Sequence, residues 1–356
     1  MSKRACRTGS GGAGTQNRGV SVFSSGFRRR LTYAIAGLLC GLSASSVAAA
    51  DDGDDLAAAI VAHIHERLPA GAPPIAPGDE NRVTSFSRYI FKTVYYPANL
   101  RDLKAAALAA IDATEQPADA TALIQSAMAG VVNSLGHGAR LLTTIGGDPG
   151  SGTSGTPSTR QIGSVRLVSL PTMNVSDDPN VRRTCADFTR YFDPQNTDAL
   201  SAVVLDLRGN EGGPLTDSSC LVGFFIKSGQ TVFQVTSKQG TLVKYETEAN
   251  GHKPFSVPVA VLIDNRTDSG AVLVAAVLQS QRHATVIGEQ KANINGAVLS
   301  LVFPPGANRG VVLPTGEILL NDKRPLATTF HVDVAMLAQD DTALLNAANA
   351  FLAKAK

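Results

Sequence analysis

Two short polar turns hold the residue types that acyl-transfer chemistry requires. One turn runs from Gly209 to Gly213, and the other, Asn265 to Asp268, leads directly into Ser269. A serine hydroxyl becomes a nucleophile only beside a base and beside N–H donors for the oxyanion that develops. Glycine allows the close approach that such donors need. The candidate oxyanion donors are the backbone amides of Gly212, Gly213 and Gly270. The competing interpretation is structural, because serine commonly caps helices and glycine suits any tight turn.

Apolar segments flank both turns and must position them. The runs Ala202–Leu205, Val259–Ile263 and Ala284–Ile287 are continuous and β-branched, which is typical of strands covered on both faces. Apolar segments of helical length, from Leu215 and from Ser269, lie between them. This order predicts an α/β core with a mixed, mostly parallel sheet and right-handed crossovers. Ligands of such sheets bind outside the carboxyl ends of the strands, which is where both turns fall.

The order of LDLRGNEGG, Ser269 and ATVIGE resembles the core of the C-terminal processing (tail-specific) proteases, from about Gly163 to Met336. The resemblance implies a crotonase-like α/β domain with a helical N-terminal region. It also implies a serine peptidase that acts on extended or unfolded polypeptides, with Ser269 as the nucleophile and no cofactor. Many members carry a peptide-binding PDZ domain ahead of the core, but this sequence leaves no room for one.

The position of the general base departs from the family pattern. The family uses a lysine held neutral by burial, and the aligned residue here is Ile294. Two acidic positions of the family are Val272 and Ser280 in this chain. Lys291 could replace the lysine if its loop is re-formed, unless it is simply a solvated loop residue. His137 could replace it as a histidine does in the tricorn-like branch, unless it is only a turn residue bonded to backbone.

Two functions therefore remain open from the sequence. The first is a serine peptidase with Lys291 or His137 as the base. The second is a catalytically inactive member that binds a peptide or an apolar ligand in the same cleft. Asp206 and Arg208 are expected to pair and to support the glycine turn rather than to react.

The first fifty residues have the order of a secretory signal peptide. Arg28–Arg30 precede the apolar run Leu31–Leu42, and Ala48–Ala50 offer small residues before Asp51. The run is shorter than the roughly 20 residues that span a bilayer. We therefore expect an exported, periplasmic or secreted protein that starts near Asp51 and has no stable membrane anchor after cleavage.

The rest of the chain is predicted to have three parts. Residues 51–144 show helical periodicity, with a Pro- and Gly-rich break at 70–81. Residues 145–161 are low in complexity and predict a flexible linker. Residues 162–356 form the α/β domain. Its later part is expected to contain strands at 298–303, 311–313 and 318–320, a turn at 314–316, and a helix at 341–353.

Composition excludes several classes of function. The formal net charge of the 356 residues is +2, and there is no tryptophan and no basic run interleaved with aromatics, so nucleic acid is not an expected partner. No histidine or cysteine has metal-ligand spacing. The partner that the family resemblance implies is a polypeptide substrate or a peptide ligand. Two cysteines remain after signal cleavage, Cys185 and Cys220. They are expected to form a disulfide if their helices share one face of the sheet.

Overall fold

The computed structural model describes residues 46–96, 98–115, 117, 119–142, 156–173, 185–192, 199–247, 253–289, 296–304 and 310–336, with positions 342, 346 and 350. Residues Ala44–Lys356 form one compact unit. The predicted signal peptide and C-terminal helix lie almost entirely outside the described residues, and Lys291 and Ile294 lie wholly outside them. No helix of the described part is long and apolar enough to cross a membrane.

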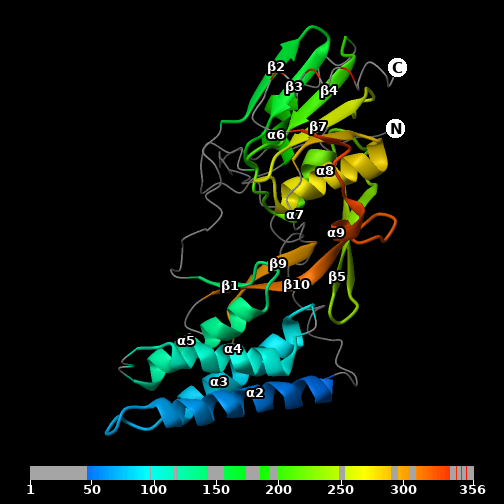
Figure 1. Ribbon diagram of the computed structural model, residues 1–356. Helices are drawn as coiled ribbons and strands as arrows, with labels where there is room; N and C mark the ends of the chain where they lie inside the picture. The colour runs from blue at the N-terminus through cyan, green and yellow to red at the C-terminus, as the bar shows by residue number, and fades with distance from the viewer. Residues whose placement is uncertain are drawn as a thin grey trace, which may run out of the picture. The chain divides into compact units, whose positions relative to one another are not determined.

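A six-stranded sheet carries the predicted α/β core. Its strand order is β11-β8-β7-β4-β3-β2, and every neighbouring pair is parallel except β2 with β3. Figure 1 labels β2, β3, β4 and β7 of this sheet. The predicted mostly parallel fold is confirmed. The strands are β2 (Ser158–Ile162), β3 (Val165–Ser169), β4 (Ala202–Asp206), β7 (Val259–Ile263), β8 (Thr285–Gly288) and β11 (Val334–Ala335).

The two faces of this sheet are buried in separate clusters, as period-two alternation along each strand requires. Val203 and Leu205 of β4 point into the larger cluster, which also contains residues of the helices α6 (Cys185–Phe192), α7 (Leu215–Val222) and α8 (Ser269–Arg282). Ala202 and Val204 point into a smaller cluster on the opposite face. Burial on both faces explains why β4 reads as an unbroken apolar run.

Strand β2 corrects the predicted linker. Its five residues pair with β3 in antiparallel register, from Ser158 opposite Ser169 to Ile162 opposite Val165. No apolar pattern marks this strand in the sequence, because all five of its residues are exposed. The linker prediction therefore ends too late, and residues 143–155 lie outside the described part.

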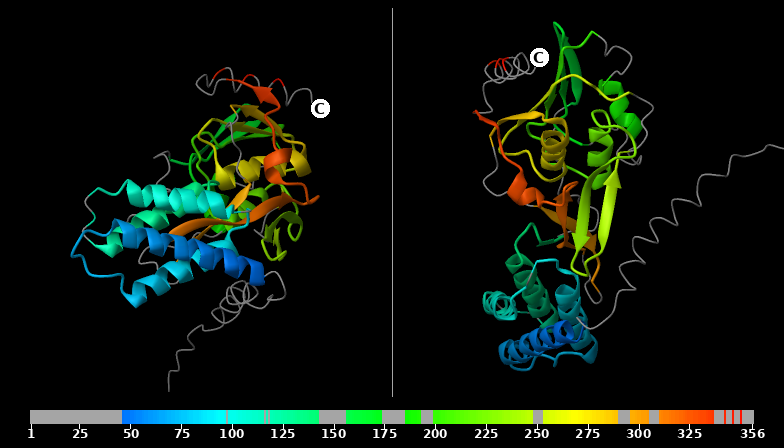
Figure 2. Two further views of the ribbon diagram at one scale, coloured as in Figure 1. Left: turned by 60° about the horizontal axis from the view of Figure 1, so that its bottom comes forward. Right: turned by 90° about the vertical axis from the view of Figure 1, so that its right-hand side faces the viewer.

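A second, five-stranded sheet has the order β1-β10-β5-β6, with β9 also paired to β10. Figure 2 shows β5 and β6 as a yellow-green hairpin. All of its described pairings are antiparallel. The strands are β1 (Arg140–Leu141), β5 (Thr231–Ser237), β6 (Leu242–Glu246), β9 (Ala297–Val302) and β10 (Val311–Leu320).

Strand β10 replaces two predicted strands and the turn between them. The chain stays extended through Pro314, and the pairing with β9 shifts register between Pro314 and Gly316. A β-bulge accommodates a proline, which has no N–H for the ladder. The expected turn at 314–316 is therefore wrong: it is an irregularity inside one ten-residue strand.

Four helices form the N-terminal region, as predicted: α2 (Ser46–Arg67), α3 (Pro77–Thr93), α4 (Leu100–Asp112) and α5 (Ala120–Ser134). The predicted break at 70–81 is too long, because α3 already begins at Pro77. Proline is well suited to the first helical turn, because N–H groups there have no acceptor within the helix and its missing N–H costs no hydrogen bond. The fully buried side chains of these helices, such as Leu56, Ile60 and Phe86, belong to one cluster with Val311 and Leu313 of β10.

The hairpin β5–β6 also holds the helical region. At its tip, the Lys238 Nζ donates a hydrogen bond to the carbonyl oxygen of Phe91, and the Gln239 Nε2 donates to that of Lys92 at 3.0 Å. Both carbonyls lie in the last turn of α3, where backbone acceptors have no partner within the helix. The two side chains therefore supply a C-terminal cap from a distant segment.

Helices α6 and α7 pack on the same face of the six-stranded sheet. Phe192 of α6 stacks on Phe224, just beyond α7, with ring centroids 4.3 Å apart, and both rings belong to the larger cluster. Cys220 of α7 is disulfide-bonded. The side chain of Cys185 lies outside the described part, so the pairing of these two cysteines stays a prediction.

Candidate active site

The two polar turns meet at one edge of the sheet. Strands β4 and β7 are parallel neighbours, with Asp206 opposite Leu262, and each turn follows the carboxyl end of its strand. The Leu207 N–H continues this pairing by donating to the Leu262 carbonyl at 2.9 Å. The expectation that both turns share the carboxyl edge is confirmed.

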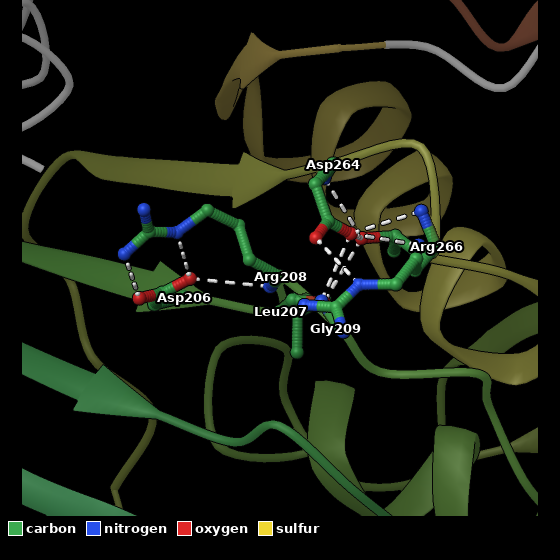
Figure 3. A network of polar contacts seen from close by, with 7 residues as sticks. Asp206, Leu207, Arg208, Gly209, Asp264 and Arg266 are labelled. Atoms are coloured by element: carbon green, nitrogen blue, oxygen red, sulfur yellow. Dashed lines mark hydrogen bonds and ion pairs between the residues drawn. The ribbon is translucent and has the colours of Figure 1, made fainter. Parts of the chain in front are cut away.

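Asp206 and Arg208 pair at the start of the glycine turn (Figure 3). The Arg208 Nε donates to Asp206 Oδ1 at 2.9 Å and the Nη2 to Oδ2 at 2.7 Å, and the Arg208 N–H also donates to Oδ1. Asp206 is buried. A bidentate pair with this geometry fixes the chain direction where the strand ends, which confirms the predicted supporting role.

Asp264 holds the second turn and ties it to the first (Figure 3). Its Oδ1 accepts hydrogen bonds from the N–H of Gly209, Arg266 and Thr267, and from the Thr267 hydroxyl. Burial of Asp264 would raise the pKa of its carboxyl. The hydrogen bonds from Gly209, Thr267 and Arg266, with the Arg266 charge, outweigh burial and hold the pKa below the ordinary value of 3.8. The carboxylate is therefore a structural acceptor that stays ionised.

Ser269 begins α8 and is an exposed residue. The N-cap of α8 is Asp268, whose carboxylate accepts the Ser269 N–H at 2.8 Å, so Ser269 is not the capping residue. Ser269 has a left-handed backbone, with φ of 48°. Such a conformation costs a non-glycine residue about 1–3 kcal/mol and is concentrated at functional sites. No side chain or backbone group of the described residues hydrogen-bonds with the Ser269 hydroxyl.

The glycine turn lies directly against this serine. Gly212 has a φ of 91°, and a Cβ placed on it would come within 2.5 Å of the Gly270 nitrogen and 2.8 Å of the Ser269 Cβ. A Cβ on Gly270 would come within 3.1 Å of the Gly213 nitrogen and 2.7 Å of the Ser218 Oγ. Only glycine fits these positions without displacing its neighbours.

The three candidate oxyanion donors, expected to act alike, differ in whether their N–H is already hydrogen-bonded. The Gly212 N–H donates to the Oδ1 of Asn210 at 2.8 Å, so this amide is occupied within the turn. The amides of Gly213 and Gly270 have no acceptor among the described residues. Both lie beside Ser269, at the beginnings of α7 and α8, where the positive ends of the helix dipoles favour a negative charge.

Asn210 is a residue of this site that the sequence analysis did not single out. It is fully buried and contacts both turns, because its carbonyl accepts the Asp268 N–H at 3.0 Å and its side chain accepts the Gly212 N–H. The available signal was an amide side chain within the short glycine-rich turn from Gly209 to Gly213. A buried amide must find partners for its donor and its acceptor.

His137 lies apart from these two turns in its described contacts. It follows α5 with a φ of 50°, and its ring stacks on Tyr96 with centroids 3.8 Å apart. Burial of Tyr96, followed by the Glu317 charge, raises the pKa of that hydroxyl to about 12. None of the ring contacts or hydrogen bonds recorded for the described residues joins His137 to the Ser269 turn.

The remaining positions of the family's site carry no charge here or lie outside the described residues. The position one turn after Ser269, acidic in the family, is Val272, whose side chain is buried in the larger hydrophobic cluster. Ser280 is half-buried near the other end of that helix. Lys291 and Ile294 lie outside the described residues. Within the described part, no group of three or more His, Cys, Asp or Glu side chains could hold a metal ion.

The comparisons with known proteins agree with this architecture. Residues 161–334 match the sequence model of Peptidase family S41. The carboxy-terminal-processing protease of Bartonella bacilliformis is 34% identical over 119 residues, which are 33% of this chain and 27% of that protein. The carboxy-terminal processing protease CtpA of Bacillus subtilis is 30% identical over 106 residues, 30% of this chain and 22% of that protein. The chain thus spans about a quarter of the length of the curated relatives that it matches.

A likeness to a solved structure extends further along the chain. A lipoprotein from Streptococcus agalactiae covers 80% of this chain with all of its own length, at a TM-score of 0.55 and 13% identity. At this identity the likeness shows the fold alone. The resemblance to C-terminal processing proteases is confirmed for the family and the fold.

Proposed function

We propose that this chain is an exported serine-type peptidase that hydrolyses peptide bonds of extended or unfolded polypeptides, with Ser269 as the nucleophile. The observation that carries the proposal is the exposed Ser269, on a left-handed backbone beside the Gly213 and Gly270 amides. The match of residues 161–334 to Peptidase family S41 supports the same chemistry.

The reaction assigns a task to each group. The Ser269 Oγ forms a bond to the scissile carbonyl carbon, its proton passes to the base, and the amides of Gly213 and Gly270 donate to the resulting oxyanion. The C–N bond then breaks as the leaving amine takes the proton. Water hydrolyses the acyl-enzyme in the second half of the reaction. Lys291 and His137 remain the two candidates for the base.

The second candidate function is a non-catalytic protein that binds a peptide or an apolar ligand at the same edge. The replacement of a family carboxylate by the buried Val272 favours it, as does Ile294 at the lysine position. The two proposals differ in one measurable property, which is the reactivity of the Ser269 hydroxyl.

A fluorophosphonate probe and an unfolded protein substrate test the choice. We expect the wild type to be labelled once and to cleave the substrate, and Ser269→Ala to lose both activities without loss of stability. Ser228→Ala is the matched control, because Ser228 is an exposed serine in a turn away from the site. Absence of labelling and of cleavage in the wild type would reject the peptidase and favour the binding protein.

The same assay identifies the base. Removing a base typically lowers the rate by orders of magnitude, so either Lys291→Ala or His137→Ala should behave like Ser269→Ala. If neither variant loses activity, both candidates are wrong.

Export is tested separately, because residues 1–45 lie outside the described part. The predicted cleavage after Ala50 falls within the first turns of α2, and the remainder keeps the buried Leu56, Ile60 and Ile64. N-terminal sequencing of the protein from a periplasmic fraction should give a start near Asp51. An intact N-terminus on cytoplasmic protein would contradict export.

A further inference from the structure

The inference concerns Asn210, the buried residue that contacts both turns of the candidate site. Its side chain is 0% exposed, although asparagine is usually found at the surface. Burying an amide is unfavourable unless its donor and acceptor are both satisfied. The partners of Asn210 therefore indicate what the residue is retained for.

Those partners come from three segments that are far apart in the sequence. The Asn210 Nδ2 donates to the Leu170 carbonyl at 2.8 Å, and Leu170 follows the carboxyl end of β3. The Oδ1 accepts the Gly212 N–H at 2.8 Å. The backbone carbonyl accepts the Asp268 N–H at 3.0 Å, one residue before Ser269. Asn210 thus connects the carboxyl ends of β3, β4 and β7.

The contact with Gly212 decides which amides face a substrate. Because the Gly212 N–H is taken up by Asn210, the donors that remain beside Ser269 are those of Gly213 and Gly270. The peptide at Gly212 is also the one that lies against Ser269, so its orientation fixes the distance between the two turns. If Gly212 were unrestrained, the choice of free amides and the distance between the two turns would both vary, since glycine has the widest choice of backbone conformations.

We propose that Asn210 is a positioning residue, which holds the Gly213 and Gly270 amides as a preformed oxyanion site around Ser269. The inference rests on the proposed peptidase function. Preorganised donors lower the barrier to the chemical step more than they strengthen substrate binding. Loss of Asn210 should therefore lower kcat and leave KM almost unchanged, which loss of stability alone would not do.

The test compares Asn210→Ala with a variant destabilised elsewhere. Ile60→Ala is the matched control, because Ile60 is fully buried in α2, within the separate cluster that the helices form with β10. Each protein is assayed well below its melting temperature, with circular dichroism as a check of folding. The measured quantities are kcat, KM and the rate constant for labelling of Ser269 by the fluorophosphonate.

We expect Asn210→Ala to lower kcat and the labelling rate by roughly 100-fold or more, the size of effect seen when an oxyanion donor is lost. KM should stay within about threefold, and Ile60→Ala should keep wild-type kinetics. If Asn210→Ala does not fold, Asn210→Ser replaces it; the serine side chain is one atom too short to reach the Gly212 amide, and the same kinetic loss is expected.

The outcomes separate the two proposals. A labelled wild type with an equally reactive Asn210 variant overturns the role of Asn210 and leaves the peptidase standing. Equal losses in the Asn210 and Ile60 variants also overturn it, because general destabilisation then explains the effect. A wild type that is never labelled at Ser269 rejects the peptidase, and the inference with it.

Discussion

Gly212 approaches Ser269 so closely that a Cβ on the glycine would come within 2.8 Å of the Ser269 Cβ. The glycine turn and the turn that leads into Ser269 are therefore one unit, although they follow different strands. A side chain at Gly212 cannot be accommodated by a rotamer change, since its other near neighbours are backbone atoms of Asp268 and Gly270.

Gly212→Ala should accordingly abolish labelling of Ser269 and destabilise the fold. Gly229→Ala is the control, because Gly229 also has a positive φ, of 77°, but nothing lies within 4 Å of its position. The control should lose about 1–2 kcal/mol from backbone conformation alone. Denaturant unfolding and probe labelling measure both effects, and equal behaviour of the two variants would contradict the close contact.

Ser269→Gly should remove activity while the protein becomes more stable. Glycine relieves the left-handed backbone, which outweighs its larger unfolded-state entropy, for a net gain of about 0.5–1 kcal/mol. Lys323→Gly should give a similar gain with full activity, since Lys323 has a φ of 66° in an exposed turn. A lower melting temperature for Ser269→Gly would show that the serine backbone is not strained.

Asp264 should make stability depend on pH at the acid end. Its pKa in the folded protein lies below the ordinary 3.8, so its stabilisation is present above about pH 4 and disappears as the pH falls through the folded pKa. Asp264→Asn should lose about 1–3 kcal/mol at pH 7, with a smaller difference from the wild type at pH 3 or below.

The control for that series is Asp322→Asn. Asp322 also has a lowered pKa, opposed by desolvation and produced by its bonds with Arg324, but it lies in an exposed turn. Its substitution should change the free energy of unfolding by under about 1 kcal/mol. A pH-independent difference between wild type and Asp264→Asn would refute the assignment.

Lys238→Met should weaken the attachment of the β5–β6 hairpin to α3. The variant loses the hydrogen bond to the Phe91 carbonyl but keeps most of the aliphatic stem, so about 1 kcal/mol of stability should be lost. Lys227→Met is the comparison, because Lys227 is exposed. Hydrogen exchange should also quicken at the C-terminal end of α3 in Lys238→Met alone.

The disulfide at Cys220 gives a prediction about thiols. If Cys185 is its partner, the mature protein should show no free thiol after denaturation without reductant, and Cys185→Ser should expose one. Loss of the bridge should cost about 2–4 kcal/mol. Two reactive thiols in the oxidised, denatured protein would exclude the bridge.

The sequence predicted the elements whose burial leaves a pattern. Strands β4 and β7 are buried on both faces, so their apolar runs are continuous, and the polar turns at their ends were correctly placed at one edge. Strand β6 was not predicted, because its first three residues are all exposed and its burial does not alternate. Proline at 314 indicated a turn, yet pairing with β9 kept the chain extended there.

The details of the site depend on contacts that no local pattern encodes. The Asn210 side chain bonds to Leu170, 40 residues earlier. Ser269 has a left-handed backbone, with its N–H bonded to Asp268 and its Cβ beside the glycine turn, which the propensity of serine does not predict. Composition around Ser269 could suggest that this serine caps the helix, and only the structure shows that the cap is Asp268.

Strand β10 is shared between two hydrophobic clusters, with Val311 and Leu313 packed among the helices and Ile318 and Leu320 packed in the α/β core. During synthesis, α2 to α5 leave the ribosome long before this strand, so the helices cannot close their own apolar interior when they first form. A nascent or truncated chain that stops before β10 would expose that interior to chaperones and to aggregation. The helices and the α/β core should therefore mature together, in one late and cooperative step.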